Sequence, residues 1–465
     1  MGRLTPTVSN GSDFETRRSD GEVRRADWKG RALHLVGVGG AGMSGLARIA
    51  VELGATVSGS DKASGGVVEQ LKGIGVTVFA SHQASNVPEG SEIVYSSAVA
   101  ADNPERARGR ELGLKELHRS ELLGEMTRLR RTIAVTGTHG KTTTTAMIVS
   151  ALRGAGMQPG WAVGADLAGG EANAGWGDPD CEWFIVEADE SDRSLLALTP
   201  EVAVLTNCEL DHHATYDSLD DLRRTLAKFL DAAPIAVVWD QPELLELVGA
   251  GTKGESYDAK GASSGPTGAS FQWRGHSVQL AVPGVHNAVN AAGALTAAAC
   301  AQPDETGLIE GIKAFAGTGR RFQRVGASSA GATLIDDYAH HPTEVAATIA
   351  AARSLAPRRV VAVFQPHLFS RTEAFFDEFG IALAAADCGL VLDIYPAREL
   401  AADFPGVTSA LIVDAANAAS GSQRFSAAGG IESASAMLRD MLADGDVCLL
   451  MGAGDVGSIA KLVAA

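Results

Sequence analysis

The sequence has few cysteines, few aromatic residues and no apolar run as long as a membrane span. Its five cysteines are scattered and form no CxxC pair, which favours free thiols in a reducing cytosol over disulfides or a zinc knuckle. No signal-like apolar segment opens the chain, and no run reaches the ~18 residues that cross a bilayer. We therefore expect a cytoplasmic protein that does not insert into membranes.

Positive charge is also scarce. The chain has 39 lysines and arginines against 56 acidic residues, which gives a formal net charge of −17. Proteins that bind nucleic acids concentrate lysine and arginine against phosphates, so this balance argues against a nucleic-acid partner. Small anionic substrates remain possible, because a local pocket can be positive on an acidic protein.

What the sequence does contain is a regular alternation of short apolar strands and helices. The 465 residues suggest about three domains, and residues 1–29 are polar and aperiodic, as in a mobile tail. The alternation then continues in three blocks, 30–127, 128–319 and 320–465. Strands and helices in this order predict an α/β fold of three domains with mainly parallel, doubly wound sheets. Ligands of such sheets bind at the carboxyl ends of the strands, where the motifs of this sequence fall.

The segment "VTGTHGKTTTT" at residues 135–145 resembles a shortened phosphate-binding loop. It follows a predicted strand, and Gly137 and Gly140 allow backbone N–H groups to face an anion at the start of a helix. Lys141 would then reach the β- and γ-phosphates, and the Thr142 hydroxyl would coordinate Mg²⁺. The alternative is an ordinary turn with an exposed lysine. The nucleotide-binding candidates are Gly137, Thr138, His139, Gly140, Lys141, Thr142 and Thr143.

Acidic residues follow the next two predicted strands. The first strand ends in "EADESD", with Glu187, Asp189, Glu190 and Asp192, and the second ends in "TNCELDHH" at residues 206–213. A dication that bridges phosphates needs oxygen ligands at such an edge. Each carboxylate alone could instead be a solvated charge, but the cluster favours metal–nucleotide binding. A zinc site at His212 and His213 is disfavoured, because adjacent histidines rarely face one ion.

A second glycine motif, "GVGGAG", lies between a predicted strand and a helix near the start of the first block. Gly37, Gly39 and Gly42 fit GxGxxG, and Asp61 ends the following strand at the spacing of a ribose-binding acid. The motif alone suggests NAD, but any diphosphate can occupy this helix N-terminus. A tight helix–strand crossing without a ligand is the third interpretation.

Nine segments in order from residue 36 to residue 457 resemble the Mur ligase family. They are "VGVGGAGMSGLA", "VTGTHGKTTTT", "EADESD", "TNCELDHH", "PGVHNAVNAAGA", "GTGRRFQ", "DDYAHHPTEV", "QPHLFSRT" and "MGAGDVG". The resemblance covers everything except the amino-terminal tail, and the family uses this shortened phosphate loop. It implies a Rossmann-like UDP-sugar domain, a central P-loop ATPase domain and a Rossmann-like carboxyl-terminal domain that closes over both.

The reaction that the resemblance implies uses ATP and Mg²⁺ to join L-alanine to UDP-N-acetylmuramate, in peptidoglycan precursor synthesis. ATP would phosphorylate the lactyl carboxylate, and the alanine amine would attack the acyl phosphate. The residues support this chemistry, because a carboxylate at neutral pH is a poor acyl donor and must first be activated by phosphoryl transfer. Metal ions and arginines would hold two anionic reactants together by neutralising their charge.

The resemblance also implies roles for individual residues. The UDP diphosphate would bind Gly39, Ala41, Gly42, Met43 and Ser44, with Asp61 towards the uridine. Thr142, Glu187 and His212 match magnesium ligands. His286 and Asn287 match an adenine-contacting pair, Arg321 a γ-phosphate arginine and Asp337 a ribose ligand. Tyr338, His340 and Arg371 would line the alanine pocket. The implied catalytic residues are Lys141, His212, Arg321, His340 and Arg371.

One position departs from the family pattern, and three rival functions stay open. Relatives commonly read "QPHR" where this chain has "QPHL", so Leu368 replaces a basic residue near the alanine pocket. The rivals are a murein-tripeptide ligase, a NAD(P)-dependent oxidoreductase built on "GVGGAG", and a nucleotide-binding regulatory module without catalysis. The oxidoreductase leaves the phosphate loop and the acidic cluster unexplained.

Overall fold

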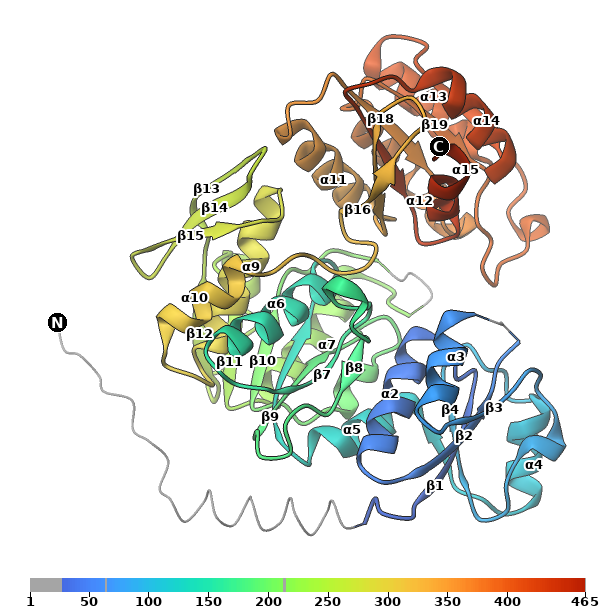
Figure 1. Cartoon of the computed structure of the whole chain (residues 1–465), viewed down its shortest axis with the longest axis vertical. Helices are drawn as coiled ribbons and strands as arrows, with labels where there is room; N and C mark the ends of the chain where they lie inside the picture. The colour runs from blue at the N-terminus through green and yellow to red at the C-terminus, as the bar shows by residue number, and fades with distance from the viewer. Residues whose placement is uncertain (1–26, 63–64, 212–214, 465) are drawn as a thin grey trace. The chain divides into compact units, whose positions relative to one another are not determined.

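The computed structural model (Figure 1) describes residues 27–62, 65–211 and 215–464. It divides into two compact units. The first unit contains residues up to Asp166 together with Glu171–Tyr257 and Gly293–Leu308. The second contains Leu167–Gly170, Asp258–Ala292 and the chain from Ile309 onward. Within the described residues the strands form four sheets, three of them mainly parallel. The predicted α/β class with three mainly parallel sheets is therefore confirmed.

The amino-terminal part of the first unit is a parallel sheet in the order β3-β2-β1-β4-β5. Its helices α2 and α3 connect β1 to β3, and α4 connects β4 to β5 (Figure 1). From β1 the chain first adds strands on one side, β2 and β3, and then on the other side, β4 and β5. Open parallel sheets bind their ligands at the strand ends beside such a switch point, here between β1 and β4. The elements are β1 (Ala32–Val36), α2 (Ala41–Glu52), β2 (Thr56–Ser60), α3 (Gly66–Gly73), β3 (Thr77–Phe79), β4 (Glu92–Tyr95), α4 (Pro104–Glu111), β5 (Glu116–His118) and α5 (Arg119–Thr127).

Trp28 begins the packed structure earlier than the sequence predicts. We assigned residues 1–29 to a mobile tail, yet the Trp28 side chain is only 4% exposed and belongs to the core of the first unit. The Arg31 guanidinium lies 4.7 Å from the centre of its ring. An aromatic ring buries a large apolar area, and the Gly30 N–H also donates to the Gly54 carbonyl at 3.2 Å, so both contacts anchor this short segment. Residues 1–26 lie outside the described part of the chain.

A second sheet completes the first unit, in the order β12-β11-β10-β6-β9-β7-β8. All neighbours in it run parallel except β7 and β8. Its strands β6, β9 and β10 are apolar and buried, as expected for a sheet covered on both faces. The elements are β6 (Arg131–Thr136), α6 (Lys141–Gly154), β7 (Gly160–Ala162), β8 (Ala174–Gly175), β9 (Trp183–Glu187), β10 (Val202–Leu205), α7 (Leu219–Asp231), β11 (Ile235–Trp239), α8 (Pro242–Leu245), β12 (Lys253–Tyr257) and α10 (Glu305–Lys313), whose last turns belong to the second unit.

The second unit is built on a six-stranded sheet in the order β16-β17-β21-β18-β19-β20. Only its edge strand β16 is antiparallel to its neighbour. A small antiparallel sheet, β13-β14-β15, precedes α9 and was not predicted. The elements are β13 (Lys260–Gly265), β14 (Gly268–Trp273), β15 (His276–Leu280), α9 (Val285–Ala298), whose last residues belong to the first unit, β16 (Gln323–Ala327), β17 (Thr333–Asp337), α11 (Pro342–Ser354), β18 (Arg359–Phe364), α12 (Phe369–Leu383), β19 (Cys388–Leu392), α13 (Ser409–Ser420), β20 (Phe425–Gly429), α14 (Ile431–Met441), β21 (Asp446–Met451) and α15 (Ile459–Val463).

A helix that crosses a bilayer must be both long and apolar. None of the helices in the described part of the chain combines the length and the apolar character that such a span requires.

Candidate active site

The phosphate loop has the predicted strand–loop–helix geometry. It leaves β6 at Thr136 and enters α6 at Lys141, with left-handed φ angles of +128° at Gly137 and +79° at Gly140. A Cβ atom at Gly137 would overlap the Thr206 hydroxyl oxygen and lie only 2.9 Å from the Asn207 backbone. Both the backbone angle and the lack of space therefore require glycine at this position.

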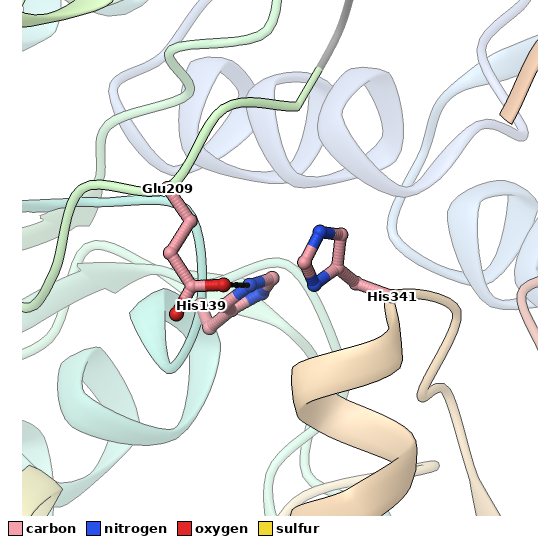
Figure 2. Close-up of side chains that lie close together, drawn as sticks. All are labelled: His139, Glu209 and His341. Atoms are coloured by element: carbon pink, nitrogen blue, oxygen red, sulfur yellow. Dashed lines mark ion pairs between the residues drawn. The ribbon is translucent and has the colours of Figure 1, made fainter. Parts of the chain in front are cut away.

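The segment after β10 holds the loop in place. The His139 N–H donates a hydrogen bond of 2.8 Å to the Asn207 side-chain oxygen, and the Thr138 hydroxyl donates one of 2.8 Å to the Glu209 carbonyl. The Thr206 hydroxyl donates to the His139 carbonyl at 2.6 Å. An ion pair of 3.4 Å also joins His139 Nε2 to Glu209 Oε2 (Figure 2). Asn207 and Glu209, predicted as part of an acidic metal edge, thus contact the loop itself.

The Lys141 ammonium group is surrounded by oxygen atoms at the start of α6. This group donates to the carbonyls of Gly137 at 2.7 Å and Thr138 at 3.0 Å, and to Glu190 Oε1 at 2.9 Å. Burial alone would lower the pKa of Lys141, but the nearby carboxylates, Glu190 first among them, outweigh burial and raise the pKa. The lysine is therefore charged and held at the position where the loop would receive phosphates.

Two predicted metal ligands lie side by side. The Thr142 hydroxyl donates a hydrogen bond of 3.0 Å to Glu187 Oε1, and the Gly164 N–H donates one of 2.7 Å to Glu187 Oε2. Threonine hydroxyl and carboxylate oxygens are hard donors of the kind that Mg²⁺ prefers, so these two residues fit that ion. His212, the third predicted ligand, and His213 lie outside the described residues.

The carboxylates of the "EADESD" segment have two different sets of partners. Glu187 and Glu190 face the phosphate loop, whereas Asp189 and Asp192 pair with Arg119, at 2.7 and 3.2 Å from its Nη2. Burial would raise the pKa of Asp189, but Arg119 and Lys141 outweigh it and lower that pKa to about 2. The cluster is therefore not a single metal site, because Asp189 and Asp192 already have a cationic partner.

The first glycine loop presents an uncapped helix end. Helix α2 begins after Gly40 with no side-chain cap and no acidic residue in its first turn, which leaves backbone N–H groups for an anion. Asp61 faces this loop, and its Oδ2 accepts a hydrogen bond of 2.8 Å from the Gly39 N–H. Of the other predicted UDP ligands, Met43 and Ser44 are buried, and the Ser44 hydroxyl donates to the Ala41 carbonyl at 3.0 Å.

In the second unit, the loop after β17 gathers several predicted residues. Asp337 accepts hydrogen bonds of 2.7 Å from the N–H groups of Phe322 and Ala339. Burial nevertheless raises the pKa of Asp337 to about 6. The Arg321 guanidinium lies 5.0 Å from the centre of the Tyr338 ring, and His340 meets the same ring edge-on at 5.2 Å.

Arg371 is buried at the start of α12 beside a histidine that the sequence analysis did not select. Its Nη1 lies 3.2 Å from His367 Nδ1, and the His367 ring stacks on Tyr395 and meets His340 edge-on. His367 could have been selected from the sequence, because its "QPH" segment directly follows the end of strand β18. Leu368 caps α12 with a left-handed φ of +70°, a strained conformation for a side chain branched at Cγ.

The predicted adenine pair lies at the start of α9. The Asn287 side-chain amide donates a hydrogen bond of 2.7 Å to the Pro283 carbonyl. Burial lowers the pKa of the neighbouring His286 to about 4, so its ring is neutral at physiological pH. These contacts order the helix start, and the role of the pair in binding adenine remains a prediction.

Glu190, Arg119 and Glu344 are further residues whose contacts the sequence analysis did not identify. Glu190 was noted only as one acid of a cluster, and Arg119 was not selected. Glu344 lies within 4 Å of both Arg321 and His340. The one available signal for Glu344 was its spacing, since an acidic residue three positions after a helix cap is typical of a capping box.

A glycine-dependent strand–loop–helix turn, a largely buried lysine at the helix start and a threonine hydroxyl paired with a carboxylate, in a chain with three mainly parallel α/β sheets, are typical of a nucleotide-binding protein of the P-loop type. Three family models match the chain in order. They are the Mur ligase family catalytic domain at residues 32–131, the Mur ligase middle domain at 135–298 and the Mur ligase glutamate ligase domain at 320–454. The chain belongs to the Mur ligase family.

Individual relatives extend this finding over most of the chain. The UDP-N-acetylmuramate–L-alanine ligase of Streptomyces griseus is 41% identical over 447 residues, which cover 91% of this chain and 94% of that protein. The enzyme of the same name from Chlorobium phaeovibrioides is 39% identical and covers 94% and 97%. Among solved structures, the UDP-N-acetylmuramate–alanine ligase of Thermotoga maritima matches with a TM-score of 0.74, 25% identity and coverage of 92% and 97%.

Proposed function

We propose that this chain ligates L-alanine to UDP-N-acetylmuramate with ATP, in the synthesis of peptidoglycan precursors. The observation that carries the proposal is the arrangement of Lys141, Thr142 and Glu187 in a Mur ligase whose relatives of this name match over more than nine-tenths of its length. A lysine charged by its surroundings and a pair of hard oxygen donors are what the transfer of a phosphoryl group requires.

In the proposed reaction a carboxylate oxygen of the muramyl lactyl group attacks the γ-phosphorus of ATP, and ADP leaves. The alanine amine then attacks the carbonyl carbon of the acyl phosphate, and inorganic phosphate leaves as the amide bond forms. Lys141 neutralises the β- and γ-phosphates, while Gly137 to Thr143 supply backbone N–H groups and hydroxyls around them. Thr142, Glu187 and His212 would hold Mg²⁺, which supplies charge neutralisation of the phosphates.

The remaining roles follow the family assignment. The loop from Gly39 to Ser44 binds the UDP diphosphate, and Asp61 closes that loop through the Gly39 N–H. In the second unit, Arg321 pairs with the terminal phosphate and Asp337 with the ATP ribose. Tyr338, His340 and Arg371 recognise the amino acid, where the Arg371 guanidinium grips the substrate carboxylate.

The test is phosphate release with ATP, Mg²⁺ and UDP-N-acetylmuramate, with each amino acid added in turn. We expect release that requires L-alanine, Mg²⁺ and the UDP-sugar together. The Lys141→Ala variant should abolish it, whereas Lys228→Ala, an exposed lysine of α7, should not. Release that responds to a murein tripeptide but not to alanine would instead support the tripeptide ligase.

A further inference from the structure

Glu344 occupies the third position of helix α11 and closes its first turn. The N–H groups of His340 and His341 donate to its Oε2 at 3.0 and 3.3 Å, and His341 Nδ1 in turn accepts from the Thr343 N–H. This is a capping box with histidine as the cap, and Figure 2 shows His341 at the start of the helix. Capping alone would account for the residue if its carboxylate made no other contacts.

The carboxylate of Glu344 also touches two side chains with proposed roles in the reaction. Its Oε1 lies 3.6 Å from Arg321 Nη1, and its Oε2 lies 3.3 Å from His340 Nδ1. The Glu344 side chain is only 12% exposed, so water screens these interactions less than it would at the surface. One buried negative charge therefore faces both the proposed phosphate arginine and the proposed amino-acid histidine.

The contacts of His340 fix the position of its ring proton. Nδ1 lies 2.9 Å from the Tyr338 carbonyl and 3.3 Å from Glu344 Oε2, and both of these are acceptors. A nitrogen that faces two acceptors must carry a proton, so in the neutral ring Nε2 is the acceptor. An Nε2 acceptor suits a pocket that receives an amino acid, since the substrate amine brings N–H donors.

We propose that Glu344 is a positioning residue for the ligation. It holds the Arg321 guanidinium and fixes the His340 tautomer, so that one carboxylate aligns the phosphate end and the amino-acid end of the reaction. This inference rests on the proposed function, because that function assigns the roles of Arg321 and His340.

The chain contains a matched control for the capping role. Helix α5 begins with the same box, in which the His118 N–H donates to Glu121 Oε2 at 2.6 Å and His118 Nδ1 accepts from the Ser120 N–H. Glu121 is exposed, and we assign it no role in the reaction. Because glutamine also serves at this position of a capping box, Glu344→Gln and Glu121→Gln both keep the box and remove one charge.

The kinetic test compares these two variants with the wild type. We expect Glu344→Gln to lower kcat/KM for L-alanine by about 10- to 100-fold, the range typical of losing the carboxylate that orients a metal-bound histidine. The KM for UDP-N-acetylmuramate should not change. Glu121→Gln should change every constant by less than about 2-fold. Equal kinetic constants for the two variants would overturn the proposal and leave Glu344 as a helix cap.

A second measurement depends neither on enzyme activity nor on a bound ligand. Nitrogen-15 NMR of the histidine rings reports which nitrogen carries the proton, and His340→Gln identifies the signal. We expect the Nδ1–H tautomer at neutral pH in the wild type and a larger share of the Nε2–H tautomer in Glu344→Gln, in which the Tyr338 carbonyl and a neutral amide oxygen replace the carbonyl and the carboxylate as acceptors. An Nε2–H tautomer in the wild type would overturn the proposal even if the chain had no ligase activity. The absence of alanine-dependent phosphate release would overturn only the proposed function.

Discussion

The ammonium group of Lys141 lies 2.9 Å from both carboxylate oxygens of Glu190. Glu190 is only 1% exposed, so this pair is buried beneath the phosphate loop. A buried charge is costly unless a partner offsets its loss of hydration, and here the glutamate supplies that partner before any nucleotide binds. The terminal phosphates of ATP would bring a second partner for the same ammonium group.

Removing the charge of Glu190 should therefore destabilise the first unit. We expect Glu190→Gln to lower its free energy of unfolding by about 2–4 kcal/mol, because Lys141 would lose its main buried counter-charge. ATP should raise the unfolding midpoint more in this variant than in the wild type, because phosphate would replace the missing carboxylate. Urea unfolding monitored by tryptophan fluorescence measures both effects.

The control for this variant is an exposed ion pair in the same unit. Lys72 and Glu69 lie 2.9 Å apart at the surface, where such pairs contribute less than about 1 kcal/mol. Glu69→Gln should thus have little effect on unfolding. If the two glutamine variants were equally stable, the buried pair would not contribute to stability.

The Thr142 hydroxyl gives a test of metal binding. We expect Thr142→Val to raise the Mg²⁺ concentration for half-maximal phosphate release by at least about 10-fold, because the variant keeps the shape of the side chain and removes an oxygen ligand. A Mg²⁺ titration of phosphate release measures the change.

Thr144, two residues further along α6, is the matched control. Its side chain is fully buried, and its hydroxyl has no hydrogen-bond partner among the described residues. Thr144→Val should leave the Mg²⁺ requirement unchanged and should not reduce stability, since an unpaired buried hydroxyl contributes nothing. A similar shift in both variants would mean that a valine anywhere in this turn disturbs the site.

Gly137 gives a test of the loop geometry. A methyl group there would overlap the Thr206 hydroxyl and meet the Asn207 backbone at 2.9 Å. Gly156 also has a positive φ, of +82° against +128° at Gly137, but a methyl group there would have no atom within 4 Å, so Gly156→Ala shows the cost of a positive φ without a clash. We expect Gly156→Ala to cost about 1–2 kcal/mol, and Gly137→Ala to cost at least about 1–3 kcal/mol more.

The same pair of variants separates stability from nucleotide binding. Gly137→Ala should abolish ATP binding measured by calorimetry, because the turn must move to relieve the clash. Gly156→Ala should bind ATP as the wild type does. Retained binding in Gly137→Ala would show that the loop adapts without its glycine.

The sequence predicted the parallel sheets well because their strands are apolar runs that end in glycine or acidic residues. The strand predicted before "GVGGAG" forms β1, and the helix predicted at the end of the phosphate loop forms α6. The small sheet β13-β14-β15 was missed. Its strands are partly exposed and lack such apolar runs, although Arg274 and Gly275, both with positive φ, form the two-residue turn that is typical of a hairpin.

The candidate site was predictable in its residue types but not in its pairings. "GTHGKT" identifies a phosphate loop from local sequence alone, because strand, turn and helix are neighbours in the chain. Arg119 and Asp189 are 70 positions apart, and no local pattern indicates that they pair. The strain at Leu368 was also hidden, since a left-handed φ in a leucine follows from its surroundings and not from its own preference.

Asp337 links pH to the stability of the second unit. Burial raises the pKa of Asp337 from 3.8 to about 6, so between these values the folded chain holds a proton that the unfolded chain has released. Stability is therefore lost as the pH rises from about 4 to 6, and the full cost of about 3 kcal/mol applies above that range. The Asp337→Asn variant cannot titrate at this position and should lack this loss.

Hydrogen exchange of a peptide that covers β17 measures this difference close to the residue itself. We expect the opening free energy of the wild type to fall by about 3 kcal/mol relative to Asp337→Asn between pH 4 and pH 7. Other ionisable groups titrate in both proteins, so their contributions largely cancel in the comparison. A constant difference across this pH range would mean that the Asp337 carboxyl group has its ordinary pKa in the folded chain, because the N–H groups of Phe322 and Ala339 would then compensate for its burial.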